Sequence, residues 1–203
     1  MRSQTLADSI VSRIYGKKRG WVFTPIRFRD LGNDAAVRKT LQCLCDQGAI
    51  RRLARGLYNY PERHPQLGEL TPPAEQIARA LAGKEGLRIQ PTGAYAANVL
   101  GLSTQVPAKA VFLTDGAERT ITVGNRTIQL KRTTPKNMAT AGRMSGLVIQ
   151  ALRHLGRDQV DASVVELLAQ QLSVDDRQEL LKDIRYAPAW IGDVFRRLAK
   201  MEK

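Results

Sequence analysis

The side chains of this sequence best suited to chemistry are cations and amides that gather in residues 33–60. Three of them fall on the outward face of a predicted helix: Arg38, Lys39 and Gln42. Three more lie in a short hairpin predicted to follow that helix: Arg51, Arg52 and Arg55. Arginine, lysine and glutamine pair with guanine and adenine edges in the DNA major groove, and basic side chains also contact phosphates. These residue types indicate nucleic-acid recognition, although an amphipathic helix also has a charged face when it binds nothing.

Hydrophobic spacing predicts the elements that position these groups. An apolar stripe at i, i+4 and i+7 marks the helix and consists of Val37, Leu41 and Leu44. Gly48 ends the helix, because glycine adopts the left-handed conformation of a helix C-terminus at low cost. Residues 50–53 and 57–60 then read as two strands around a glycine-containing turn. A helix followed at once by a basic hairpin is typical of the recognition helix and wing of a winged helix-turn-helix.

The preceding residues complete that pattern. The spacing of apolar residues predicts an amphipathic helix over residues 4–15, and residues 21–23 are a short β-prone stretch. Thr24 and Pro25 predict the start of a second helix, with threonine as its N-cap and proline at its first position. Asn33 is a suitable N-cap for the recognition helix. The order helix, strand, helix, turn, helix, hairpin therefore accounts for residues 4–60.

Positive charge is concentrated in the same region. The chain of 203 residues has 32 basic and 19 acidic residues, a net charge of +13. Residues 1–64 hold thirteen basic against five acidic residues, so +8 of this charge lies in under a third of the chain. Such a balance favours a polyanionic partner, for which nucleic acid is the usual case. Weaker candidates for phosphate contacts form one basic turn: Lys17, Lys18 and Arg19.

Proline and glycine are frequent in the segment that precedes the second half of the chain. They predict a short ordered linker at residues 63–73, between a domain of residues 1–62 and a domain of residues 74–203. Within the second domain, strand patterns occupy about 87–131 and helical patterns about 137–200. We therefore expect an α+β protein, in which an N-terminal winged helix-turn-helix precedes a mixed domain with a small β-sheet and a helical C-terminal part.

Residue patterns for catalysis or metal binding are absent from the sequence. It contains no G-x-x-x-x-G-K, G-x-S-x-G or H-E-x-x-H motif. Cys43 and Cys45 point away from each other on a helix, and His64 and His154 are isolated. We expect no enzyme, no metal and no cofactor. Because there is no apolar run of about 18 residues and no apolar leader, we expect a cytoplasmic protein without membrane contact.

Two stretches of the chain resemble a known family. They are VRKTLQCLCDQGAIRRLARGLYNYP and TGAYAANVLGLSTQVPAKAVFLTDGAERTITVGNRTIQLKR. Together they are similar to the AbiEi-like antitoxins of type IV bacterial toxin–antitoxin systems, in a shorter form. The resemblance covers about residues 1–135. Its most specific part is the run A-A-N-x-L-G-L-x-T-Q-x-P with the T-D-G and G-N-R-x-I segments that follow it.

That resemblance implies an antitoxin whose winged helix binds inverted repeats of double-stranded DNA in its own promoter and represses the operon. The implied partner is a nucleotidyltransferase-type toxin encoded next to it, neutralised with or without a stable complex, in systems linked to phage defence. A monomer or weak dimer would bind the DNA cooperatively. By position, the recognition helix supplies Arg38, Lys39 and Gln42, and the wing supplies Arg51, Arg52 and Arg55.

Three alternatives remain at this point. The protein could be an interaction module whose basic face docks an acidic toxin or a toxin-bound RNA. It could be a winged-helix regulator unrelated to toxin–antitoxin systems. It could also be an enzyme that reverses the toxin's modification.

Overall fold

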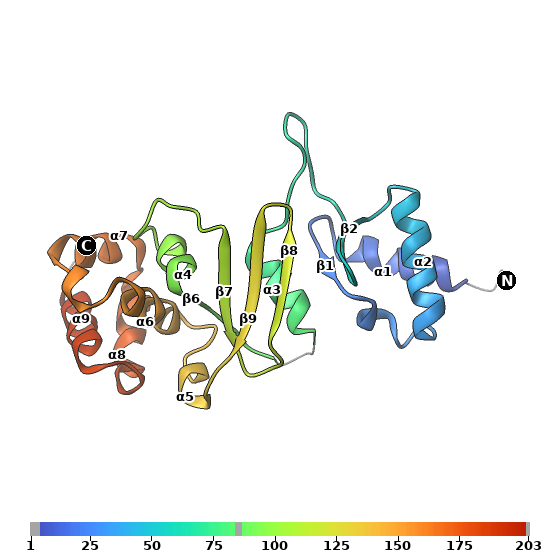
Figure 1. Ribbon diagram of the computed structural model, residues 1–203. Helices are drawn as coiled ribbons and strands as arrows, with labels where there is room; N and C mark the ends of the chain where they lie inside the picture. Colours follow the sequence, from blue (N-terminus) through green and yellow to red (C-terminus); the bar gives the residue numbers. More distant parts are fainter. Residues whose placement is uncertain (1–4, 84–86, 202–203) are drawn as a thin grey trace. The chain divides into compact units, whose positions relative to one another are not determined.

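The computed structural model describes residues 5–83 and 87–201 and shows an α+β protein with three small sheets (Figure 1). The chain divides into two compact units, Met1–Glu85 with Ile121–Val123, and Gly86–Thr120 with Gly124–Lys203. We call them the first and the second unit. No helix in the described part of the chain is long and apolar enough to cross a lipid bilayer.

The first unit begins with three helical segments and a three-stranded sheet. In chain order they are α1 (Leu6–Gly16), β1 (Val22–Phe23), the 3-10 helix η1 (Pro25–Phe28), α2 (Asp34–Asp46), β2 (Arg51–Ala54) and β3 (Leu57–Asn59). The strands are antiparallel in the order β1-β3-β2. The helices and the sheet share one core, in which Phe23, Phe28 and Leu41 are fully buried.

The helix ends follow from capping residues. Thr5 and Asp8 form a capping box at the start of α1, so two otherwise unpaired backbone N–H groups gain acceptors. The Asn33 side chain accepts a 2.8 Å hydrogen bond from the backbone N of Ala36 and caps α2 as predicted. After α2, Gly48 has a φ of +70°, the left-handed conformation expected of it. The first residue of the predicted 4–15 helix, Gln4, lies outside the described residues.

The helix predicted after Thr24 is replaced by the four-residue 3-10 helix η1. Phe28 is fully buried and Leu31, three residues later, is half-buried, whereas Ile26 is exposed. Ile26 therefore lies outside the core of the first unit.

The predicted linker contains structure of its own. β4 (Arg63–His64) and β5 (Gly68–Glu69) pair as an antiparallel hairpin. α3 (Ala74–Ala82) follows and belongs to the first unit, so the division between units lies after α3 and not at residues 63–73.

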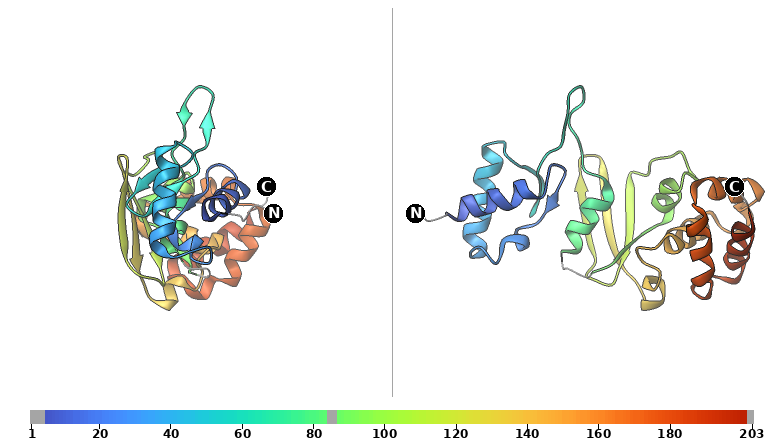
Figure 2. Two further views of the ribbon diagram at one scale, coloured as in Figure 1. Left: turned by 90° about the vertical axis from the view of Figure 1, so that its right-hand side faces the viewer. Right: turned by 180° about the vertical axis from the view of Figure 1, so that it is seen from behind.

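After α3 the chain forms a four-stranded sheet and a helical part (Figure 2). The elements are β6 (Ile89–Thr92), α4 (Gly93–Val99), β7 (Lys109–Thr114), β8 (Arg119–Val123, of which Ile121–Val123 belongs to the first unit), β9 (Arg126–Arg132), α5 (Pro135–Met138), α6 (Met144–Leu155), η2 (Arg157–Gln159), α7 (Ala162–Gln171), α8 (Val174–Lys182), η3 (Ile184–Tyr186) and α9 (Ala189–Lys200). The strand order is β6-β7-β9-β8. β6 is antiparallel to β7, and β7 is parallel to β9.

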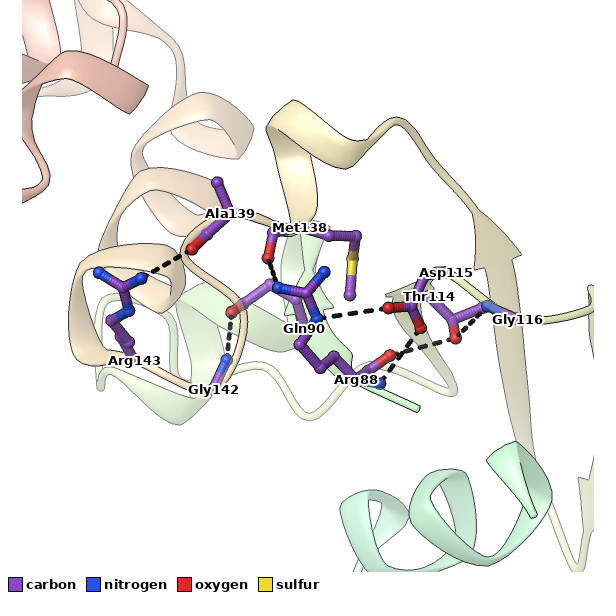
Figure 3. A network of polar contacts seen from close by, with 9 residues as sticks. All are labelled: Arg88, Gln90, Thr114, Asp115, Gly116, Met138, Ala139, Gly142 and Arg143. Carbon is purple, nitrogen blue, oxygen red and sulfur yellow. Dashed lines mark hydrogen bonds and ion pairs between the residues drawn. The ribbon is translucent and has the colours of Figure 1, made fainter. Parts of the chain in front are cut away.

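The T-D-G segment, residues 114–116, is a turn that ties the sheet together (Figure 3). The buried Thr114 hydroxyl donates to the Arg88 carbonyl at 3.1 Å and accepts from the Gly116 N at 3.0 Å. Asp115 accepts from both the backbone N and the guanidinium of Arg88. The Arg88 guanidinium also donates to the Met138 carbonyl at 2.9 Å. These contacts give the motif a structural role.

The A-A-N-x-L-G-L segment also has a structural role. Ala96 and Ala97 are fully buried where α4 packs against α6. The Asn98 side chain donates to the Ser103 carbonyl at 3.1 Å, and Gly101 has a φ of +69° just after the helix. Small side chains permit the close helix packing, and the amide and the glycine shape the turn that follows.

Candidate nucleic-acid interface

The outward face of α2 carries the three predicted recognition residues. Arg38, Lys39 and Gln42 are all exposed, while the apolar stripe of Val37 and Leu41 is buried. The predicted amphipathic pattern of this helix is therefore confirmed. The arrangement follows from the helical period, because these three residues and the stripe fall on different sides of a helix with 3.6 residues per turn.

The cations on α2 are unengaged. Within the described part of the chain, the side chains of Arg38 and Lys39 have no hydrogen-bond or ion-pair partner. Gln42 donates a 2.8 Å hydrogen bond to the Asp46 carboxylate one turn away. The Arg38 and Lys39 side chains are thus available to a ligand. The Gln42 amide becomes available when it gives up its exposed hydrogen bond to Asp46.

The β2–β3 hairpin carries two further exposed cations. The side chains of Arg52 and Arg55 make no hydrogen bond or ion pair with a described residue. Arg55 occupies the turn of the hairpin, where Gly56 has a φ of +73°. Burial raises the pKa of the Cys45 thiol on α2, the Asp46 carboxylate raises it further, and the Arg52 charge opposes this rise. This raised pKa keeps Cys45 a neutral thiol, so a nucleophilic role is not supported.

Arg51 does not belong to this exposed group. Its guanidinium donates to the Asn59 side-chain oxygen at 3.2 Å and to the Leu70 carbonyl at 2.9 Å, and lies 3.5 Å from the Glu69 carboxylate. Asn59 is fully buried, and its Nδ2 is the buried side-chain polar atom without a partner among the described residues. The Arg51 guanidinium is therefore engaged within the first unit, and its predicted contact with DNA stays a prediction.

The basic turn of Lys17, Lys18 and Arg19 follows α1 and is exposed. The Arg19 guanidinium lies 4.7 Å from the centre of the Tyr60 ring and donates to the Pro61 carbonyl at 3.0 Å. Within the described residues, the side chain of neither lysine has a hydrogen-bond or ion-pair partner.

Strand register separates this turn from the hairpin tip. The turn leads into β1, and Gly20 donates to the Tyr60 carbonyl beyond the end of β3. The tip lies at the other end of β3, where Ala54 pairs with Leu57. The basic turn and Arg55 at the hairpin tip therefore lie at opposite ends of one short sheet.

No metal site is found in the described residues, since no three His, Cys, Asp or Glu side chains gather there. The exposed His64 uses its Nδ1 to accept from the backbone N of Gln66 and Leu67. Asp176 forms a capping box with Ser173 at the start of α8. These groups have local structural roles.

Comparison with known proteins identifies a family. Residues 9–180 match the profile of DUF6088, a family of unknown function, and the chain belongs to this family. No curated protein matches the sequence. A solved structure to which the chain is similar is that of the RV2827C protein from Mycobacterium tuberculosis, with 15% identity, coverage of 98% of this chain and 77% of that chain, and a TM-score of 0.47. That likeness is too distant to bear on function.

Proposed function

We propose that the first unit is a winged helix-turn-helix domain and that the protein represses transcription by binding double-stranded DNA at a specific sequence. The observation that carries the proposal is the exposed pair Arg38 and Lys39 on α2, whose side chains have no partner among the described residues, followed along the chain by the exposed cations Arg52 and Arg55 of the β2–β3 hairpin. The order of α1, η1, α2 and the β2–β3 hairpin, with β1 beside it, is compatible with that class of domain. In this view η1 is the shortened second helix.

The dimensions of α2 suit the major groove. A helix with its side chains is about 10–12 Å across and B-DNA has a major groove about 12 Å wide. Arg38, Lys39 and Gln42 then face base edges, where arginine or lysine pairs with guanine and glutamine with adenine. Arg52 and Arg55 neutralise phosphates, which supplies affinity that falls with salt but carries no sequence information.

We further propose that the repressed operon is the protein's own and that the protein is the antitoxin of a nucleotidyltransferase-type toxin. The support for this part is the resemblance of residues 1–135 to AbiEi-like antitoxins. In this proposal the protein is not an enzyme, and inverted repeats in the promoter are bound cooperatively.

Fluorescence anisotropy tests the DNA-binding part. The purified chain is titrated onto the duplex upstream of its gene and onto a scrambled duplex, at about 50 and 150 mM salt. We expect a preference for the upstream duplex that persists at the higher salt. Lys39→Ala should weaken binding to the upstream duplex by about 1–3 kcal/mol and reduce the preference. Arg52→Ala should weaken binding to both duplexes alike and lower the salt slope by about one.

Arg79→Ala is the matched control, because it removes one exposed charge of the same unit from α3, outside α2 and the hairpin. It should leave both affinities unchanged. Equal losses on both duplexes for every α2 variant would refute base recognition by this helix.

Co-expression tests the antitoxin part. The toxin encoded beside this gene should arrest growth alone and be tolerated when the protein is present. In the proposed arrangement, Lys39→Ala loses repression and keeps part of the neutralisation. Full operator binding with loss of neutralisation in the Lys39 and Arg52 variants would instead identify the basic face as a toxin-docking surface.

A further inference from the structure

A hairpin of residues 62–70, which we call the arm, projects from the first unit (Figures 1 and 2). Its strands β4 and β5 pair in the register Arg63 with Glu69 and His64 with Gly68. Every residue from 62 to 69 is exposed. Leu67, near the tip, is 72% exposed, the most of any large apolar side chain described. An apolar side chain at the end of a projecting hairpin is a candidate contact point.

The arm is held firmly at its base. A two-stranded hairpin without a core is marginal in water, so its order needs other contacts. The backbone N of Leu70 donates to the Glu62 carbonyl at 2.8 Å, and Arg51 donates to the Leu70 carbonyl at 2.9 Å. Glu69 lies within 3.5 Å of Arg51 and within 3.3 Å of Arg63. These contacts make Arg51 a positioning residue for the arm.

The tip is ordered by its own contacts. The His64 side chain accepts hydrogen bonds from the backbone N of Gln66 at 3.2 Å and of Leu67 at 3.3 Å. These two bonds satisfy turn N–H groups and fix the direction of the tip residues. Because the tip is already ordered, binding through Leu67 costs little conformational entropy.

The surroundings of the arm are positive. The arm and the groups at its base carry five cations and two carboxylates, a net charge of +3: Lys17, Lys18, Arg19, Arg51 and Arg63 against Glu62 and Glu69. Glu69 forms ion pairs with Arg51 and Arg63. Gly20, which follows the basic turn, lies close to the Glu62 side chain, since a Cβ added to this glycine would be 3.3 Å from the carboxylate. The basic turn therefore lies beside the arm. This charge favours a polyanion over an acidic or apolar protein surface.

The arm also lies at a defined end of α2. The chain passes from the C-terminus of α2 into β2, and Arg51 at the start of β2 pairs with Asn59, just before the arm. The β2–β3 tip lies at the opposite end of that sheet. The arm therefore leaves the sheet at the end that follows the C-terminus of α2.

We propose that the arm enters the minor groove of the DNA whose adjacent major groove receives α2, an inference that rests on the proposed function. Leu67 packs against sugars or wedges at a base step, as apolar side chains do in minor-groove proteins. Gln66 and Arg63 face the acceptors of that groove, and the basic turn at the base contacts phosphates. The arm would thereby extend the bound site beyond the bases that α2 reaches.

Hydroxyl-radical footprinting and anisotropy of the full chain on its upstream duplex test this. We expect Leu67→Ser to lose protection in one minor-groove tract beside the α2 site and to bind roughly tenfold more weakly, like the loss of one good base contact. Leu167→Ser, which alters a 42% exposed leucine on α7, is the matched control and should bind as wild type does. Both side chains are exposed, so folding is retained and circular dichroism verifies it.

Inosine provides a second readout. Replacing G·C by I·C pairs in that tract removes the guanine amino group from the minor groove and leaves the major groove unchanged. The inosine substitution should change the affinity of the wild-type protein for the duplex and leave the affinity of the Leu67→Ser variant unchanged. A Leu67→Ser variant with wild-type affinity and footprint would overturn the arm proposal while the proposed function stands.

The remaining outcomes are also decisive. If wild type shows no preference for its upstream duplex, the proposed function and the arm proposal both fail. If Leu67→Ser binds DNA normally and no longer neutralises the toxin, the arm contacts a protein and the minor-groove proposal is wrong.

Discussion

The buried Arg177 on α8 should be a major source of stability in the second unit. Its side chain is among the most buried charged groups, with 3% of the residue exposed, and has no acidic partner among the described residues. It donates to three carbonyls, those of Ala169 at 2.7 Å, Leu172 at 3.3 Å and Met201 at 2.6 Å. The first two belong to the end of α7, where the helix itself leaves carbonyls unpaired and favours a cation.

Arg177→Met keeps an apolar stem of similar length and removes the donors. Two of the three hydrogen bonds are buried, so two carbonyls lose their partners away from water. Each such loss costs about 1–3 kcal/mol, and the part-buried Met201 carbonyl regains water. We therefore expect the free energy of unfolding to fall by about 2–6 kcal/mol.

Urea unfolding measures this loss unit by unit, because each unit holds one of the two tryptophans, Trp21 and Trp190. In a Trp21→Phe background the fluorescence reports the second unit alone. Arg197→Met, an exposed cation on α9, is the control and should change stability by less than about 0.5 kcal/mol. A loss of under about 1 kcal/mol for Arg177→Met would refute the assignment of a stabilising role to these bonds.

Two further predictions concern the individual units. In the first unit, the hydrogen bond from Arg13 lowers the pKa of the Asp30 carboxyl. The ion pair therefore stabilises the folded state fully at pH values above the ordinary aspartate pKa of about 3.9. This stabilisation is lost as the pH falls through the lower pKa of the folded state. Thermal unfolding from pH 7 to about 2.5 should show a steeper acid loss for wild type than for Asp30→Asn, and parallel curves would contradict this. In the second unit, Gly146→Ala should destabilise by about 1–3 kcal/mol because the new Cβ overlaps the Thr140 carbonyl, although alanine is the better helix former. Gly16→Ala, with no heavy atom within 4 Å of its Cβ, is the control, and a stabilised Gly146→Ala would show that the loop moves aside freely.

Local periodicity was sufficient to predict the first unit's main helix and the exposure of its polar face. The Val37 stripe and the cap at Asn33 are both local signals, and both appear in the structure. The same reasoning failed at residues 25–28, where an α-helix was predicted and a 3-10 helix is found. Four residues are too few to distinguish the period of 3 of a 3-10 helix from the period of 3.6 of an α-helix. Exposure of Arg38, Lys39 and Arg55 followed from these local patterns, whereas their role in binding stays a prediction.

The arm and Arg51 could not be predicted, for two physical reasons. A hairpin with no buried face has no hydrophobic alternation, so its proline and glycine read only as a linker. The partners of Arg51 are supplied by residues 8 to 19 positions away, and a helix or strand pattern says nothing about such contacts. For this reason, the sequence predicted the same exposed, DNA-contacting position for Arg51 as for its neighbour Arg52.

The unpartnered amide of Asn59 has a consequence for amide hydrogen exchange. A buried donor without an acceptor costs about 1–3 kcal/mol, and this cost disappears once water reaches it. Release of Arg51 from Asn59 and Leu70 gives water that access, which offsets part of the energy of the broken bonds. The Leu70 amide, bonded to the Glu62 carbonyl, should therefore exchange through a partial opening at the base of the arm, well before the amides of α2 that exchange only on unfolding of the whole unit.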